Sequence, residues 1–370
     1  MVPRLRAIRR WGIAAPDPRT VILRLQFAVQ TDGSGDSRPG AAARLTPMLP
    51  VRAPVTPPVD LAAGIRDLKR ELNAVILAHY YQEGEIQDAA DFIGDSLQLA
   101  RQAAHTSADV IVFCGVHFMA ESAKILSPHK QVLLPDLAAG CSLSESAPAA
   151  AFAAFVAAHP GHQVVTYVNS SAAVKALSDW CCTSSNAVAV VEAIPRDVPI
   201  IFAPDKYLGD WVARKTGRDL VLWDGSCEIH ELFSASAIAD MKAAHPGCVV
   251  LVHPECPHPV RLLADVVGST KGLLDAVRRG DPLGTYLVVT EPGIIHQMRK
   301  VAPLATFLMA PAAVRGQQGV CTSCNTCPHM RRNTLEKLWW CLRSRAPEIH
   351  LAPDLIARAR LPIERMLSLG

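Results

Sequence analysis

Two features are missing from this sequence, and each absence excludes a class of protein. Half of the residues are hydrophobic, yet no uncharged apolar run reaches the about 20 residues that a membrane span needs. We therefore expect no membrane partner. A secretory signal is also missing, and the eleven cysteines are an odd number, which argues against a disulfide framework. Both observations favour the reducing environment of the cytoplasm.

The body of the chain also lacks the basic surface of a nucleic-acid-binding protein. The net charge is +3, and residues 1–50 hold eight Arg against three Asp, which is +5, so the rest of the chain carries −2. A body without excess positive charge does not attract phosphate backbones. We therefore expect small molecules, and no nucleic acid, as its partners.

Residues 1–58 differ in composition from the rest. They are rich in Arg, Pro and Gly, and residues 31–40 have the composition of a disordered segment. We expect a disordered extension, or a mis-started one with Met48 nearer the natural start. An organelle transit peptide is the alternative, because such peptides are rich in Arg and poor in acidic residues.

From Leu61 onward, short runs rich in β-branched residues alternate with helical stretches, which predicts a parallel α/β fold. The candidate strands fall into three sets of three. These are residues 74–78, 110–115 and 132–135, then 164–168, 200–204 and 220–224, and finally 249–252, 286–290 and 306–310.

The three sets repeat in close register, 88 and 86 residues apart. The residues that close the first strand of each set are His79, Tyr167 and His253. Two positions further on lie Tyr81, Asn169 and Glu255. Seventeen positions after the first group, three hydroxyl residues each open a helical stretch: Ser96, Ser184 and Thr270.

Such a repeat predicts three homologous αβα sandwich units with parallel sheets, arranged with pseudo-threefold symmetry around a central active site. Ligands bind beyond the carboxyl ends of parallel strands, so the residues in register are expected to converge on one pocket. The hydroxyl residues have the chemistry of helix N-caps, where free N–H groups favour anions. We place the units at residues 59–138, 139–225 and 226–328, and expect helices of residues 329–370 to pack on the first unit.

A cysteine follows the third strand of each set, which supplies one thiolate per unit. These cysteines are Cys141, Cys227 and, in the third unit, one of the triplet Cys321, Cys324 and Cys327. Three thiolates suit a [4Fe–4S] cluster with one open iron, or a zinc site with an open position. Spacing does not choose within the triplet. Two residues separate the first two cysteines of the triplet, whereas three residues separate them in radical S-adenosylmethionine enzymes. This spacing argues against that class of enzyme.

The other cysteines lie on or beside apolar strands and helices, where small hydrophobic residues are expected. They are Cys114, Cys181, Cys182, Cys248, Cys256 and Cys341.

Many short stretches resemble one family, the quinolinate synthases of bacterial NAD biosynthesis, in order and at family-like spacing. The resemblance runs from about Leu61 to the C-terminus. The matching stretches are residues 77–82, 94–100, 115–121, 167–170, 182–186, 253–256, 268–270 and 333–336.

The resemblance implies one [4Fe–4S] cluster with three protein ligands and one open iron. On the matching positions the ligands are Cys141, Cys227 and Cys327. It also implies that Cys321 and Cys324 are not ligands, and it suggests a reversible disulfide between them.

The reaction that the resemblance implies is condensation of iminosuccinate with dihydroxyacetone phosphate, giving quinolinate, phosphate and water. An L-aspartate oxidase would supply the imine. The expected catalytic residues are Glu255, His253 and Tyr81, because enolisation and dehydration need proton shuttles. The expected substrate-binding residues are His79, Ser96, Tyr167, Val168, Asn169, Ser184, His253, Pro254, Glu255 and Thr270.

A second hypothesis is a zinc or iron–sulfur redox sensor whose cysteine triplet switches the binding of a partner. It accounts for the triplet but not for polar residues in register at three sets of strand ends.

Overall fold

The computed structural model describes residues 56–313, 320–321 and 325–369, which belong to one compact unit. Residues 1–55 of the expected N-terminal extension, with Met48, lie outside these residues, and so does Cys324. No helix in the described part of the chain is long and apolar enough to cross a membrane.

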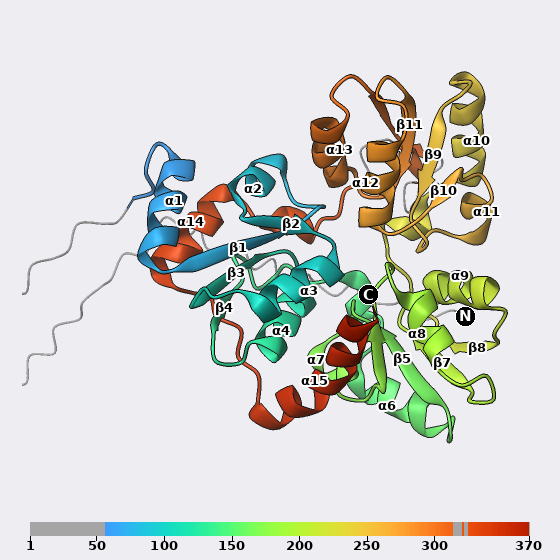
Figure 1. Ribbon diagram of the computed structural model, residues 1–370, viewed down its shortest axis with the longest axis horizontal. Helices are drawn as coiled ribbons and strands as arrows, with labels where there is room; N and C mark the ends of the chain where they lie inside the picture. Colours follow the sequence, from blue (N-terminus) through green and yellow to red (C-terminus); the bar gives the residue numbers. More distant parts are fainter. Residues whose placement is uncertain (1–55, 314–319, 322–324, 370) are drawn as a thin grey trace, which may run out of the picture. The chain divides into compact units, whose positions relative to one another are not determined.

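Three four-stranded parallel sheets, each flanked by helices, form three α/β units that Figure 1 shows in blue-green, green and gold-orange. All three sheets share one strand order: β2-β1-β3-β4, β6-β5-β7-β8 and β10-β9-β11-β12. The predicted fold class is confirmed. The short edge strands β2, β6 and β10 were not predicted, because two or three residues are too few to show a period.

The element bounds follow the repeat. The first unit contains α1 (Leu61–Glu71), β1 (Ala74–His79), α2 (Gly84–Ala89), β2 (Phe92–Gly94), α3 (Ser96–His105), β3 (Val110–Cys114), α4 (His117–Leu126) and β4 (Gln131–Leu133). The second contains α5 (Ser142–Glu145), α6 (Ala149–Ala157), β5 (Gln163–Tyr167), α7 (Ala172–Lys175), β6 (Trp180–Cys182), α8 (Ala187–Ala193), β7 (Ile200–Ala203), α9 (Lys206–Thr216) and β8 (Leu220–Leu222).

The third unit is built in the same way. It contains η1 (His230–Leu232), α10 (Ala235–Ala244), β9 (Val249–Val252), α11 (His258–Arg261), β10 (Val266–Val267), α12 (Thr270–Arg279), β11 (Thr285–Val289), η2 (Pro292–Ile294), α13 (Ile295–Val301), β12 (Thr306–Met309), β13 (Ala312–Ala313) and β14 (Val320–Cys321). The chain ends with η3 (Met330–Arg332), α14 (Leu335–Ser344) and α15 (Pro353–Ser368).

The repeat extends to single hydrogen bonds. An aspartate before each edge strand accepts an N–H from the first strand of its own sheet, at 2.8 Å in every unit. The donor and acceptor pairs are Ile76 and Asp91, Val164 and Asp179, and Val250 and Asp265. This bond fixes where each first strand lies relative to its edge strand. Residues at the same place in the repeat therefore lie at the same place at the carboxyl end of each sheet.

The three units meet through side chains near the starts of α3, α8 and α12. Ser185 Oγ donates to Asp95 Oδ2 at 2.6 Å and lies 2.8 Å from Ser269 Oγ. One residue from each unit therefore takes part in this junction. It holds the carboxyl ends of the three sheets close to one another, which places a pocket between them.

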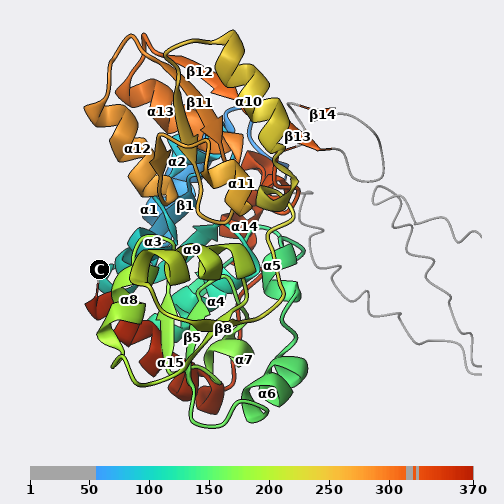
Figure 2. The same cartoon turned by 90° about the vertical axis from the view of Figure 1, so that its right-hand side faces the viewer.

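The two C-terminal helices contact different units. Helix α14 packs against α1 of the first unit, whereas we expected all of the helices of residues 329–370 to pack there. Helix α15 packs mainly against β6 and α7 of the second unit, with a smaller contact to α4 (Figure 2). Asn186 Nδ2 donates to the Met366 carbonyl at 2.9 Å, and Arg365 lies over the Trp180 ring. This helix therefore ties the second unit to the first.

Candidate active site

One cavity between the three units collects most of the residues that the sequence singled out. We call it the central pocket. The expected residues that line it are His79, Tyr81, Ser96, Cys141, Tyr167, Asn169, Ser184, Cys227, His253, Glu255, Thr270 and Cys327. Val168 and Pro254 are buried and are not among the lining residues.

The three cysteines in the pocket begin three similar helical turns. The carbonyl of each accepts the N–H of the residue four positions later, so each cysteine stands at the start of its turn. The bonds run from Glu145 to Cys141 (2.9 Å), from Glu231 to Cys227 (2.9 Å) and from Arg331 to Cys327 (3.3 Å). Free N–H groups of each turn also face the thiol: those of Leu143 and Ser144, of His230, and of His329 and Met330.

The chemistry of this donor set fits an iron–sulfur cluster. Burial raises the pKa of Cys141 to about 12 and of Cys327 to about 11, and raises the pKa of Cys227 well above its usual range. Cys327 also opposes the ionisation of Cys141, and both of these thiols oppose that of Cys227. A bound metal supplies the positive charge that converts such thiols to thiolates, and the turn N–H groups stabilise sulfur ligands further.

The remaining cysteines are not part of this set. Cys321 is disulfide-bonded, and the expected partner Cys324 lies outside the described residues. The six cysteines assigned to the core are free thiols, and all six are buried. Cys327 is therefore the described member of the triplet that faces the pocket together with Cys141 and Cys227.

Two histidines in register have the same hydrogen-bond geometry. His79 Nδ1 accepts the N–H of Tyr81 at 3.2 Å, and His253 Nδ1 accepts the N–H of Glu255 at 3.4 Å. Burial lowers the pKa of both rings to about 3, although Glu255 opposes the shift. Both rings are therefore neutral, and the proton on Nε2 is available as a hydrogen-bond donor.

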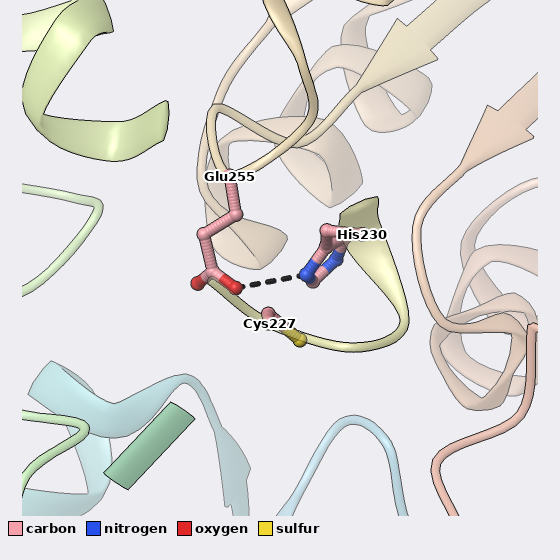
Figure 3. Close-up of side chains that lie close together, drawn as sticks. All are labelled: Cys227, His230 and Glu255. Carbon is pink, nitrogen blue, oxygen red and sulfur yellow. Dashed lines mark hydrogen bonds and ion pairs between the residues drawn. The ribbon is translucent and has the colours of Figure 1, made fainter. Parts of the chain in front are cut away.

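Glu255 receives hydrogen bonds from two other parts of the chain. Tyr167 Oη donates to Oε1 at 2.6 Å, and His230 Nδ1 lies 2.8 Å from Oε2 (Figure 3). Burial opposes the ionisation of Glu255, but the two neighbouring histidines and these hydrogen bonds outweigh burial and lower its pKa. Glu255 is therefore a carboxylate that is ready to accept a proton.

The same network continues to the opposite wall of the pocket. His230 Nε2 lies 2.9 Å from Thr290 Oγ1, which lies 2.5 Å from Tyr81 Oη. Two expected catalytic residues, Glu255 and Tyr81, are thus joined through His230 and Thr290. Sequence reasoning missed both linking residues. The spacing of His230, three positions after Cys227, was the signal for one of them.

A second group of donor atoms could hold a single metal ion. The Cys227 sulfur, a His230 ring nitrogen and a Glu255 oxygen lie within 4.8 Å of one another. Figure 3 shows that the three side chains point toward one another. His230 and Glu255 already bond to each other and to Thr290 and Tyr167. Metal binding here would break that network, whereas the three cysteine thiols accept hydrogen bonds from backbone N–H groups of their own turns.

The helix starts are capped one residue earlier than we expected. Asp95 caps α3 by accepting the N–H of Gln98 at 2.9 Å, and Ser269 caps α12 by accepting the N–H of Gly272 at 3.2 Å. The N-cap role is therefore wrong for Ser96 and Thr270. Because another side chain makes the cap, their hydroxyls are not needed for it and line the pocket.

Ser184 is not an N-cap either, because the N-cap residue of α8 is Asn186, and the Ser184 hydroxyl is hydrogen-bonded to Tyr167. Asn169 adds an acceptor to the same wall: its Oδ1 is buried and has no hydrogen-bond partner among the described residues. A buried amide without a partner is costly, which is the pattern expected of a residue that binds a ligand.

Comparisons with known proteins point to one family. The family model "Quinolinate synthetase A protein" matches residues 63–368. A quinolinate synthase of a Synechococcus species is 59% identical over 313 residues, which is 85% of this chain and 96% of that protein. The quinolinate synthase of Thermosynechococcus vestitus is 58% identical over 319 residues, 86% of this chain and 98% of that one. The quinolinate synthase of Chloroherpeton thalassium is 55% identical over 312 residues, 84% and 95% of the two chains.

Proposed function

The chain belongs to the quinolinate synthetase A family, and we propose that it condenses iminosuccinate with dihydroxyacetone phosphate in NAD biosynthesis. The products are quinolinate, one phosphate and two waters. The observation that carries the proposal is the meeting of three thiols, one following the last strand of each sheet, in a pocket with an ionised Glu255.

Cys141, Cys227 and Cys327 would hold a [4Fe–4S] cluster. With three protein ligands, such a cluster would have one open iron and would supply Lewis-acid chemistry for loss of a hydroxyl group. The equivalent turns at the three cysteines support this assignment, because a nearly symmetric ligand is best held by equivalent donors. Cys321, which is disulfide-bonded, is not part of the ligand set.

The two substrates carry carboxylates and a phosphate, and the pocket offers neutral donors for them. Nε2–H of His79 and of His253 can each donate to an anionic oxygen, and the hydroxyls of Ser96 and Thr270 add further donors. These groups keep their protons near neutral pH. They can therefore donate hydrogen bonds to anions without first taking up a proton. Asn169 Oδ1 accepts from an N–H or O–H of the substrate.

Glu255 is the proposed general base. Its carboxylate removes a proton next to a carbonyl or imine carbon, and its bond to His230 holds the unprotonated form ready. Tyr81, joined to the same network through Thr290, is the proposed group that returns a proton to a departing hydroxyl. Burial raises the pKa of Tyr81 well above its usual value, which keeps its hydroxyl protonated.

We further propose that the enzyme works in the cytoplasm and receives its imine from an L-aspartate oxidase. The test is an anaerobic assay in which such an oxidase generates iminosuccinate in the presence of dihydroxyacetone phosphate. Quinolinate formation that depends on both substrates and on iron supports the proposal. A protein that binds zinc without sulfide and forms no quinolinate would contradict it and favour the sensor hypothesis.

A further inference from the structure

The first two cysteine turns are tied to their sheets by the same backbone bond. In the first unit, the N–H of His117 donates to the carbonyl of Ala139 at 2.8 Å, two residues before Cys141. In the second unit, the N–H of Lys206 donates to the carbonyl of Gly225 at 2.9 Å, two residues before Cys227. Each bond ties the segment before the cysteine to the residues that follow β3 or β7, and so fixes where the thiol enters the pocket.

The third unit cannot form this bond. Strand register aligns Val116 with Asp205 and Glu291, so the residue equivalent to His117 and Lys206 is Pro292. Proline has no backbone N–H to donate. Cys327 therefore needs another attachment to the end of its sheet.

Glu291 provides an attachment of a different kind. Its side chain is 1% exposed, and its Oε1 accepts from the Arg331 guanidinium at 3.0 Å and from the N–H of Cys327 at 3.5 Å. The N–H of Arg331 in turn donates to the carbonyl of Cys327 at 3.3 Å. The hydrogen bond from the Cys327 amide to Glu291 is long, but the one from Arg331 is charge-assisted. Arg331 is thus hydrogen-bonded both to Glu291 and to the carbonyl of Cys327.

The other two units have no equal need for an acid at this position. Asp205, the equivalent residue in the second unit, caps α9 through the N–H of Leu208 at 2.7 Å, and the Cys227 amide faces the same carboxyl. There the backbone bond is also present. The first unit has Val116, with no side-chain cap, and relies on the backbone bond. The acid matters most where proline has removed the backbone bond.

We propose that Glu291, together with Arg331, is the positioning residue that holds Cys327 at the central pocket in place of the backbone bond made in the other two units. Its importance for the cluster rests on the proposed function, because Cys327 is a ligand only in that case. The positioning itself concerns the thiol and can be tested without iron.

The test measures alkylation rates of the cysteines in metal-free, reduced protein, with each label assigned to its residue by mass spectrometry. The variants are Glu291→Ala and the conservative Glu291→Gln. Controls are Asp205→Asn, where the backbone bond remains, and Glu83→Gln, which removes the half-exposed carboxylate on the other side of Arg331.

In Glu291→Ala the rate at Cys327 should rise about tenfold relative to Cys141 in the same sample, since a buried charge-assisted bond is lost. Glu291→Gln should give a smaller rise at Cys327, and the two controls should leave its rate within about twofold of wild type. An unchanged ratio in Glu291→Ala would overturn the proposal. A parallel rise at Cys141, Cys227 and Cys327 would also overturn it, because the residue would then support the whole fold.

The second readout is the retention of iron and sulfide by reconstituted protein under a chelator. Glu291→Ala should lose them about 10 to 100 times faster than wild type, as is typical when a group supporting a ligand is removed. Retention equal to wild type would overturn the proposal. If Cys327 alkylation rises selectively but even the wild type binds no iron and sulfide, the positioning holds and the proposed function fails.

Discussion

The two parts of the central pocket are built by different rules. The cysteine turns repeat both position and chemistry. Each has one thiol, and the carbonyl of each cysteine accepts a hydrogen bond from the N–H of the residue four positions later. The ends of the first strands repeat position but not chemistry: they carry His79 with Tyr81, Tyr167 with Asn169, and His253 with Glu255. A symmetric ligand needs equivalent donors, whereas two unlike substrates need a different group at each place. The repeat therefore supplies a framework in which one part stays uniform and the other diverges.

The strongest test of this difference removes the uniform part. Cys141→Ala, Cys227→Ala or Cys327→Ala should each abolish cluster absorbance and quinolinate formation, because two thiolates cannot hold the cluster. Anaerobic iron and sulfide assays with visible spectra measure the effect. Cys321→Ala is the matched control and should keep the cluster. If Cys321→Ala loses it and Cys327→Ala keeps it, the assignment within the triplet is wrong.

Changes at the diverged part should leave the cluster in place. Glu255→Gln keeps the shape of the side chain but removes the base, so kcat should fall by about 100- to 10,000-fold with unchanged iron content. Steady-state kinetics under anaerobic conditions measure kcat. Near-normal turnover would show that Glu255 is not the base.

A smaller effect is expected at the wall that binds substrate. Asn169→Ala removes an acceptor that has no partner among the described residues, so KM should rise by about 10-fold while kcat and iron content change little. Asn169→Asp, of nearly the same size, adds a negative charge and should raise KM further. A fall in kcat without a change in KM would instead place Asn169 in the chemical step.

The smallest effect concerns stability against pH. Folding lowers the pKa of His79 and of His253 from 6.5 to about 3, so the unfolded chain binds more protons below pH 6.5. The stability that these rings contribute is present above pH 6.5 and is lost as the pH falls toward 3. Between pH 7 and pH 5 the free energy of unfolding of metal-free protein should fall by roughly 2 kcal/mol for each ring.

Denaturant titrations at the two pH values measure this loss. His79→Gln cannot be protonated in this range and should lose less stability than wild type over the same interval. An equal loss in variant and wild type would contradict the neutral state assigned to His79.

The sequence predicted the framework because the framework repeats. Positions such as His79, Tyr167 and His253 could be found by register alone, and one cysteine per unit followed from the same register. The three sheets and the shared pocket are where that register places them. The repeat allows this prediction because equivalent strands end at the same place in their sheets.

The parts that do not repeat could not be predicted in this way. Thr290 contacts Tyr81 across 209 residues, and Glu291 contacts Arg331 across 40, without a periodic signal for either pair. The caps by Asp95 and Ser269 were misplaced by one residue, since neighbouring polar residues compete for the same amide. Which residue makes the contact or the cap depends on local geometry, and the spacing of residues in the sequence does not predict that geometry.

The central claim is that the three cysteines that follow the three sheets, Cys141, Cys227 and Cys327, hold a single [4Fe–4S] cluster with one open iron. Mössbauer spectroscopy of protein reconstituted with ⁵⁷Fe tests it most directly, together with sulfide and zinc analysis. We expect about four irons and about four sulfides per chain, with one iron distinct from the other three because it lacks a thiolate ligand. Four indistinguishable irons, or zinc without sulfide, would contradict the account.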